Sequence, residues 1–359
     1  MFDDFYHFED KEKLKDEYLG VINTVKEIDD KVIKVLPSQD KTALGGTVHL
    51  AVALSKDVQG LPAELTNIPI VVRPKDCMPR DYIQNNITTN VPLIKNFDWV
   101  QHYRTNDKHV LVVSGGDLDF KKIKSVKNKY KAEVWCVKHS YPRLLENGIV
   151  PDYCVILDPR PLDGISTHGV KRKDLFETIN NHTTFLIASM TDPSVVLHIM
   201  SKTNKVYGFH AYTDAIRDTG DNTKVTVDKT LPIPEGSLLI SGGTAAATRT
   251  IGLLETLGFK NIHMFGFDCS IKNITDEMKQ TKDEEGRDMY IHVTTGGEKF
   301  YTTGELLALA QDLEKMFEKK DLGLNIQFYG SGSLASQVFK QSYYNTQFKH
   351  FDKTIWQKN

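Results

Sequence analysis

The sequence predicts an α/β protein with a doubly wound, mostly parallel sheet, helices on both faces and a smaller N-terminal α+β lobe. From residue 108 onward, short apolar runs alternate with amphipathic stretches of helix length, which is the pattern of strand-helix-strand crossovers. Two of the apolar runs lead into a pair of glycines. With 359 residues, of which 40% are hydrophobic, the chain is long enough to bury the core of such a fold.

The expected elements follow this alternation. Apolar runs predict strands at 109–113, 133–137, 153–157, 185–188, 205–209, 237–240, 261–267 and 325–329. Helical periodicity predicts helices at 120–130, 141–147, 194–201, 244–257 and 304–319. Two long polar insertions, 211–235 and 270–303, interrupt the pattern after strands. Because ligands bind at the carboxyl ends of parallel strands, we expect these insertions to take part in substrate selection.

This pattern divides the chain into three parts. Residues 1–107 are expected to form an N-terminal helix and an irregular, proline-punctuated α+β lobe, and residues 108–335 the main α/β domain. Residues 336–359 form a polar C-terminal tail with interspersed aromatic residues. We expect this tail either to dock on the protein or to mediate self-association into a homo-oligomer.

Composition excludes several classes of protein. A formal net charge of -2 argues against nucleic acid as the main partner, and the spacing of the lysines between 121 and 131 suits the solvated face of a helix. No stretch approaches the length of a membrane span, and the N-terminus has no apolar signal segment. The four cysteines show no C-x-x-C spacing, which favours buried free thiols. The expected location is therefore cytoplasmic.

The two glycine loops are candidate nucleotide-binding segments. Ser114-Gly115-Gly116 and Ser241-Gly242-Gly243-Thr244 each connect an apolar strand to a helix. Glycines let a backbone approach a phosphate closely, and the following helix N-terminus presents free N–H groups. Neither loop matches a full phosphate-binding signature, so a tight turn is the alternative.

Carboxylates at strand ends are the candidate catalytic and metal-binding groups. Asp158 ends an apolar strand, with Arg160 nearby as a charge clamp, and Asp268 ends another. Such carboxylates can hold Mg²⁺ against phosphate oxygens, and Asp117 and Asp119 beside the first glycine loop are further metal-ligand candidates. The alternative for Asp158 is a cap on the turn that continues into Pro159. Histidines and cysteines are not clustered, which argues against a zinc site.

Together these motifs resemble a known family. The run Gly148-Ile149-Val150-Pro151-Asp152 leading to Asp158-Pro159, together with both glycine loops and Phe265-Gly266-Phe267-Asp268, resembles the MptE-like 6-hydroxymethylpterin diphosphokinases, which also include bacterial motility accessory factors. The Gly-Ile-x-Pro-Asp segment is also similar to thiamin pyrophosphokinases, although only Asp158 stands where they carry an Asp-x-Asp pair. The first loop departs from the family's Gly-Pro-Ser-Leu by reading Gly115-Gly116-Asp117-Leu118.

The resemblance implies a Rossmann-like nucleotide-binding domain and a choice of activities. The first is a Mg²⁺-dependent transferase that moves a diphosphoryl group from a nucleoside triphosphate such as ATP to a small alcohol acceptor. The second is a glycosyltransferase with a CMP-sugar donor, as similarity to sialyltransferases suggests for motility accessory factors. The third is a non-catalytic nucleotide-binding module. The first two place a nucleotide phosphate at the same edge of the sheet and differ in which bond breaks.

Overall fold

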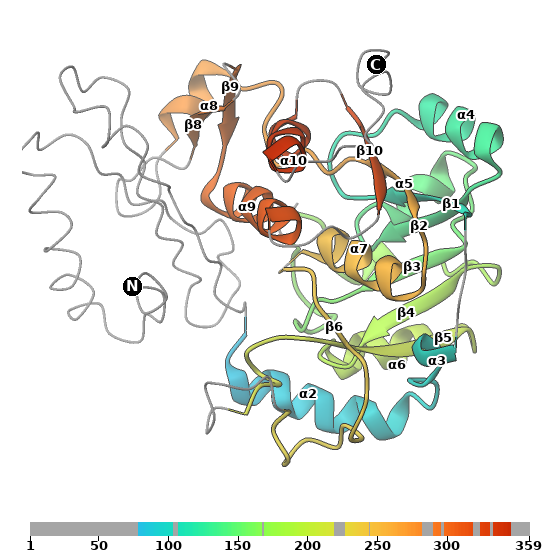
Figure 1. Ribbon diagram of the computed structural model, residues 1–359. Helices are drawn as coiled ribbons and strands as arrows, with labels where there is room; N and C mark the ends of the chain where they lie inside the picture. Colours follow the sequence, from blue (N-terminus) through green and yellow to red (C-terminus); the bar gives the residue numbers. More distant parts are fainter. Residues whose placement is uncertain are drawn as a thin grey trace, which may run out of the picture.

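The computed structural model describes residues 78–102, 107–166, 169–218, 227–243, 245–281, 290–295, 298–318, 324–330 and 333–345. Within these residues, eight parallel strands form one sheet in the order β10-β7-β1-β2-β3-β4-β5-β6 (Figure 1). The strands are β1 (His109–Val113), β2 (Glu133–Val137), β3 (Tyr153–Ile156), β4 (Thr184–Ala188), β5 (Val206–Ala211), β6 (Leu239–Ile240), β7 (Asn261–Phe265) and β10 (Asn325–Tyr329). The predicted doubly wound, parallel α/β fold is confirmed.

Helices cover both faces of this sheet. One face packs against α2 (Arg80–Leu93), α3 (Trp99–His102), α7 (Ala246–Thr256), α9 (Gly304–Glu318) and α10 (Leu334–Asn345). The other packs against α4 (Phe120–Tyr130), α5 (Tyr141–Glu146), α6 (Pro193–Met200) and the short 3-10 helix η1 (Asp174–Phe176). Figure 1 shows these helices around the central strands.

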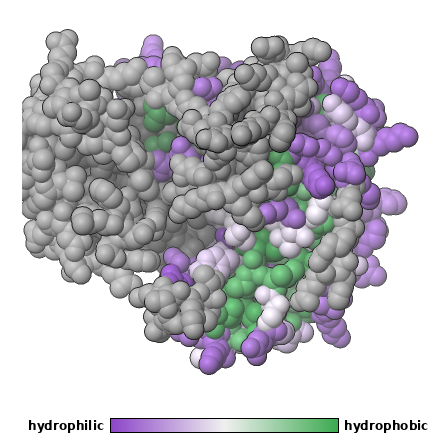
Figure 2. Space-filling view, in the orientation of Figure 1, coloured by the Kyte–Doolittle hydropathy of each residue, from purple (hydrophilic) through white to green (hydrophobic). Residues whose placement is uncertain are grey.

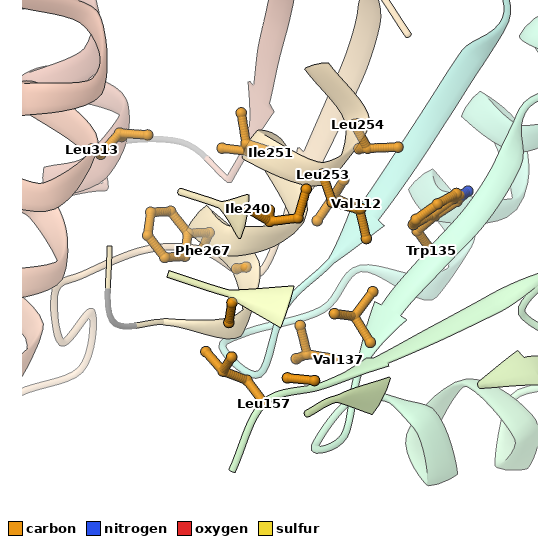
Figure 3. Packing of buried hydrophobic residues seen from close by; sticks show 14 of the residues in the cluster. Val112, Trp135, Val137, Leu157, Ile240, Ile251, Leu253, Leu254, Phe267 and Leu313 are labelled. Atoms are coloured by element: carbon orange, nitrogen blue, oxygen red, sulfur yellow. The ribbon is translucent and has the colours of Figure 1, made fainter. Parts of the chain in front are cut away.

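The central strands are mostly apolar because both of their faces are buried. Val112 of β1 belongs to one hydrophobic cluster, whereas its neighbour Val113 belongs to the other. Successive side chains of a strand point to opposite faces, so a strand covered on both sides needs an unbroken apolar run. Figure 3 shows Ile251 and Leu254 of α7 near Val112 and Trp135 of the sheet. Cys136 and Cys154 lie in the same core as free, buried thiols, as the sequence predicted.

Helix α4 has the solvated lysine face that the sequence predicted. Ile123 and Val126 are buried, while Lys121, Lys122 and Lys124 are exposed. The corner of the molecule at α4 is accordingly hydrophilic in Figure 2. The run of lysines is thus the outer side of an amphipathic helix.

Helices from outside the expected main domain pack on its sheet. Residues 1–77, most of the expected N-terminal lobe, lie outside the described residues, but α2 buries Ile83 and Ile87 in the core of the sheet domain. The expected C-terminal tail begins at residue 336, within α10, and Phe339 of that helix is buried. Packing on the sheet therefore involves residues on both sides of the expected main domain.

The second polar insertion contains regular structure that the sequence analysis did not predict. It includes the short helix α8 (Asp276–Gln280) and the antiparallel pair β8 (Ile291–Thr295) and β9 (Glu298–Thr302). Among the described residues these two strands pair with each other and lie outside the eight-stranded sheet. Across the described part of the chain, no helix combines the length and the apolar character needed to cross a bilayer.

Two buried histidines make the stability of this fold dependent on pH. Burial lowers the pKa of His210 and of His263 to about 4, from an ordinary value of 6.5. Both are neutral in the folded protein, so their contribution is fully present above pH 6.5 and is lost as the pH falls toward 4. Each depressed pKa corresponds to at most about 3 kcal/mol of unfolding free energy. We expect urea denaturation to give a clearly lower unfolding free energy at pH 4.5 than at pH 7.

A variant that lacks one of the two buried histidines separates this effect from the general destabilisation of the protein by acid. In His263→Gln, whose amide can replace one ring nitrogen, the loss between pH 7 and 4.5 should be smaller than in the wild type. Replacing the exposed His182 by Gln should leave the loss unchanged. Equal pH dependence in all three proteins would contradict the assignment to His263.

Candidate functional site

The strand order of the sheet reverses between the neighbouring strands β1 and β7. From β1 the chain moves strand by strand to β6 on one side, then returns to place β7 and β10 on the other side of β1. In open α/β sheets, ligands bind outside the carboxyl ends of the strands where the order reverses. The loops that follow β1 and β7 meet at this switch point.

The first glycine loop is held from the side by an arginine of α5. Arg143 donates hydrogen bonds to the carbonyl oxygens of Gly115 (3.0 Å) and Gly116 (2.8 Å). Ser114 is buried, and its N–H donates to the carbonyl oxygen of Phe265 at 2.7 Å. Arg143 was not predicted from the sequence, because nothing in the local pattern shows that a side chain of α5 reaches back to the preceding loop.

The first loop packs directly on the end of β7. The Gly116 N–H donates to the Gly266 carbonyl oxygen at 2.8 Å, and the Asp117 N–H donates to Asp268 Oδ2 at 3.2 Å. A Cβ on Gly116 would lie 2.5 Å from that carboxylate oxygen and 2.6 Å from the Gly266 oxygen. Glycine is therefore required here for contact between two loops, and a carboxylate occupies the place beside the Asp117 amide.

The second glycine loop folds back on the first turn of α7. Gly242 and Gly243 have φ values of +134° and +75°, which favour glycine. Arg249 donates to the carbonyl oxygen of Ile240 at 2.6 Å and also to that of Gly243. A Cβ on Gly243 would lie 2.6 Å from Asp312 Oδ2 of α9. An arginine thus fixes the carbonyl groups of this loop too.

The structure describes only some of the remaining residues of this loop. Ser241 is exposed, whereas Thr244 lies outside the described residues. Ala245 occupies the N-cap of α7 and makes no side-chain capping bond. The predicted roles of Ser241 to Thr244 in nucleotide binding stay predictions.

We expect Gly243→Ala to be more destabilising than Gly148→Ala. Both glycines have left-handed backbones, with φ of +75° and +67°, but an added Cβ at Gly148 meets nothing within 4 Å. Gly148→Ala should cost about 1–2 kcal/mol of unfolding free energy from backbone strain. Gly243→Ala adds a clash with Asp312, about 1–3 kcal/mol more. Denaturant titration measures both, and equal losses would show that the loop can move away from α9.

Both glycine loops flank the end of β7. Burial raises the pKa of the Cys269 thiol well above its usual value, and the carboxylates of Asp268 and Asp312 raise it further. Asp268 contacts the first loop and Asp312 contacts the second. Two segments far apart in the sequence thereby reach one region of the sheet edge.

Asp268 is a half-buried carboxylate that forms no ion pair within the described part of the chain. Burial raises its pKa, the nearby Asp117 carboxylate raises it further, and the Asp117 N–H and Lys272 only partly offset this. No lysine, arginine or histidine among the described residues forms an ion pair with it. The surroundings of Asp268 therefore favour the arrival of a cation.

Asp158 has the opposite environment. It forms ion pairs with Lys138, with Arg160 (Nε to Oδ1, 2.8 Å) and with Arg172 (Nε to Oδ2, 3.9 Å). A second Arg160 nitrogen donates to Oδ2 at 3.0 Å. Burial alone would raise the pKa of Asp158, but Lys138 and Arg160 outweigh it and hold the pKa well below its usual range. Its oxygens already bind protein cations, which leaves little room for a metal ion.

Of the three cations paired with Asp158, Arg160 was predicted from the sequence and Lys138 and Arg172 were not. Lys138 directly follows β2, as Asp158 closely follows β3, so the same reasoning about strand ends could have identified it. Arg172 lies in the loop after β3 and donates to the carbonyl oxygens of Pro161 (2.8 Å) and Ile165 (3.0 Å). No sequence signal marks that position.

The predicted metal ligands are thus separated. Asp119 is the N-cap of α4, where its carboxylate accepts the Lys122 N–H at 3.0 Å, and Asp117 is exposed at the switch point. No three His, Cys, Asp or Glu side chains in the described ranges are grouped as a ready-made metal site. Mg²⁺ is commonly held by one or two carboxylates together with substrate phosphates. Asp117 and Asp268 fit that requirement.

The fold and the switch-point carboxylates define a doubly wound α/β protein of the Rossmann-like kind, with its candidate site at the reversal of strand order. The family described as 6-hydroxymethylpterin diphosphokinase MptE-like matches residues 83–273, more than half of the chain. The chain belongs to this family, as the sequence motifs predicted.

Comparison with individual proteins adds less. No curated protein matches the chain. One solved structure that matches is the MAf glycosyltransferase from Magnetospirillum magneticum AMB-1, with 14% identity and a TM-score of 0.48. The match covers 76% of this chain and 44% of that one, so the chain spans less than half the length of that enzyme.

Proposed function

We propose that the chain is a nucleotide-dependent transferase that moves a diphosphoryl group from a nucleoside triphosphate to a small alcohol. One observation carries the proposal: Asp268 is half-buried at the switch point, next to a second carboxylate and without an ion-pair partner among the described residues. Membership of a family described as a diphosphokinase supports it.

The carboxylates and the glycine loops would have different roles in the transfer. Asp268 and Asp117 would hold Mg²⁺ against the donor's phosphates, and the bound ion would neutralise charge on the transferring group. The loops 114–116 and 241–244 would position the nucleotide beside it. The acceptor's hydroxyl oxygen bonds to the β-phosphorus and loses its proton to water. The bond from that phosphorus to the α-β bridging oxygen breaks, and a nucleoside monophosphate leaves.

A thermal-shift panel tests the proposal. ATP, GTP, CTP, CMP and a CMP-sugar are each added with and without Mg²⁺, since a ligand at a hundredfold excess over Kd stabilises a protein by about 2.7 kcal/mol. We expect a nucleoside triphosphate to raise the melting temperature only when Mg²⁺ is present. No shift with any nucleotide would overturn the proposal.

The products then separate the candidate activities. AMP released from ATP in the presence of an alcohol acceptor supports diphosphoryl transfer. CMP released from a CMP-sugar would assign glycosyl transfer instead. Binding of a nucleotide without either product would indicate a non-catalytic module.

A further inference from the structure

Most N–H groups of the first glycine loop are already used within the protein. Those of Ser114 and Gly116 donate to carbonyl oxygens at the end of β7, at 2.7 and 2.8 Å. The N–H of Asp117 donates to the carboxylate of Asp268 at 3.2 Å. A loop that cradles a phosphate does so with N–H groups that have no other partner. The backbone of this loop therefore has few donors left for a phosphate.

Arg143 brings a positive charge to the same loop. Its Nη1 atom donates to the carbonyl oxygens of Gly115 (3.0 Å) and Gly116 (2.8 Å), and its Cζ atom lies 6.0 Å from the centre of the Phe120 ring. No carboxylate in the described part of the chain forms an ion pair with Arg143. The charge of the guanidinium group is thus available to an anionic ligand.

One side of this guanidinium group has no protein partner. Of its five N–H donors, those on Nε and Nη2 make no hydrogen bond within the described ranges. Neither nitrogen is among the buried unpaired atoms of these residues, so both are open to solvent. Nε–H and Nη2–H lie side by side in one plane, which matches two oxygens of a phosphate. Because Nη1 is held by the loop, these donors are oriented before a ligand arrives.

The arginine of the second glycine loop lacks this access. Arg249 also donates to carbonyl oxygens of its loop, but it is only 4% exposed. Arg143 is half-buried, and Gly116, which it contacts, directly precedes the exposed Asp117. A ligand at the switch-point carboxylates can therefore reach Arg143, whereas Arg249 is confined to supporting its loop.

We propose that Arg143 binds the phosphate chain of the nucleotide through Nε and Nη2, so that the first glycine loop holds phosphate through this arginine rather than through its own N–H groups. The identity of the ligand as a nucleotide rests on the proposed function. Asp117 and Asp268 would hold the metal ion of the Mg²⁺-phosphate complex, while Arg143 would hold phosphate oxygens. Arg143 is then a binding residue that recognises an oligophosphate.

Inorganic tripolyphosphate, a phosphate chain without a nucleoside, is the probe. Its binding to the full chain is measured by calorimetry in the presence of Mg²⁺. We expect Arg143→Gln to bind it at least about tenfold more weakly than the wild type, since a charge-assisted contact is lost. The glutamine amide can still donate to a carbonyl oxygen of the loop, so the fold should be retained.

The dependence on salt distinguishes a phosphate contact from support of the loop. Salt screens contacts between charges. The affinity of Arg143→Gln should therefore fall less steeply with increasing NaCl concentration than that of the wild type. Weaker binding with the wild-type dependence on salt would mean that Arg143 only shapes the loop, which would overturn the inference.

Two further variants complete the comparison. Arg143→Lys keeps the charge but not the paired donors, so its affinity should lie between those of the wild type and Arg143→Gln. It also serves as the test if Arg143→Gln does not fold by circular dichroism. Arg80→Gln is the matched control, because Arg80 donates to carbonyl oxygens of a different loop, those of Asp214 (2.7 Å) and Arg217 (2.6 Å). It should bind tripolyphosphate like the wild type.

Binding of Mg²⁺-ATP to the same variants separates this inference from the proposed function. Arg143-dependent binding of tripolyphosphate without binding of any nucleotide would refute only the proposed function. Equal stabilisation of the wild type and a folded Arg143→Gln protein by Mg²⁺-ATP would remove Arg143 from the site and leave the proposed function standing. The inference is also wrong if the wild type does not bind tripolyphosphate, or if a folded Arg143 variant binds it with wild-type affinity.

Discussion

Asp158→Asn is expected to lower the unfolding free energy by about 3–5 kcal/mol, the usual cost of breaking a buried ion pair from one side. The asparagine keeps the shape of the side chain, but its neutral amide cannot compensate Lys138, Arg160 and Arg172. Three cations would then lie close together in a buried place. Denaturant titration at neutral pH measures the loss.

Asp228→Asn is the matched control. Asp228 forms an ion pair with Arg80 at 3.3 Å, and the two side chains are 23% and 37% exposed. Exposed pairs of this kind contribute about 0–1 kcal/mol. In Asp158→Asn, adding Lys138→Met should restore part of the stability by removing one uncompensated charge. Equal, small losses of unfolding free energy in Asp158→Asn and Asp228→Asn would show that Lys138, Arg160 and Arg172 are stable without the carboxylate of Asp158.

Asp268→Asn is expected to abolish the Mg²⁺-dependent effect of a nucleotide and to lower the transfer rate by about 10²-fold or more, the scale of removing one electrostatic group from a reaction centre. The fold should be retained, because an asparagine oxygen can still accept the Asp117 N–H. The raised pKa means that ionised Asp268 costs folding free energy at neutral pH. The melting temperature without ligand should therefore stay the same or rise.

Asp119→Asn controls for the loss of an acid in the same region. Asn caps a helix as well as Asp does, so α4 should keep its N-cap and the nucleotide response should not change. Activity and Mg²⁺-dependent thermal shift are measured for both variants. A folded Asp268→Asn protein with an undiminished response to Mg²⁺ and nucleotide would remove Asp268 from the site.

The surroundings of these two carboxylates could not be predicted from the sequence. Asp158 and Asp268 look alike in the sequence, since each closely follows an apolar run. In the structure Asp158 is surrounded by three cations, whereas Asp268 is half-buried with a raised pKa beside a second acid. The difference comes from side chains that reach each carboxylate from other segments of the chain, such as Arg172 from the loop after β3.

Elements with a strong local pattern were predicted closely. β1, β2, β10 and α4 have the predicted bounds, because each has its own apolar run or amphipathic repeat. α2 was missed because its proline, Pro92, and its polar asparagines obscure the helical pattern. Asn86 and Asn90 donate to backbone oxygens after β3 and β4, so this helix depends on contacts that lie far away in the sequence.

The sequence by itself determined the parallel α/β fold, the family and the glycines and carboxylates at the ends of the strands. These follow from local periodicity and from short motifs, which are properties of neighbouring residues. Only the tertiary structure decided that β1 and β7 are adjacent and that Asp117 lies beside Asp268. It also decided that Asp158 forms ion pairs with Lys138, Arg160 and Arg172. Charge compensation depends on distances between segments, and the order of residues along the chain does not contain those distances.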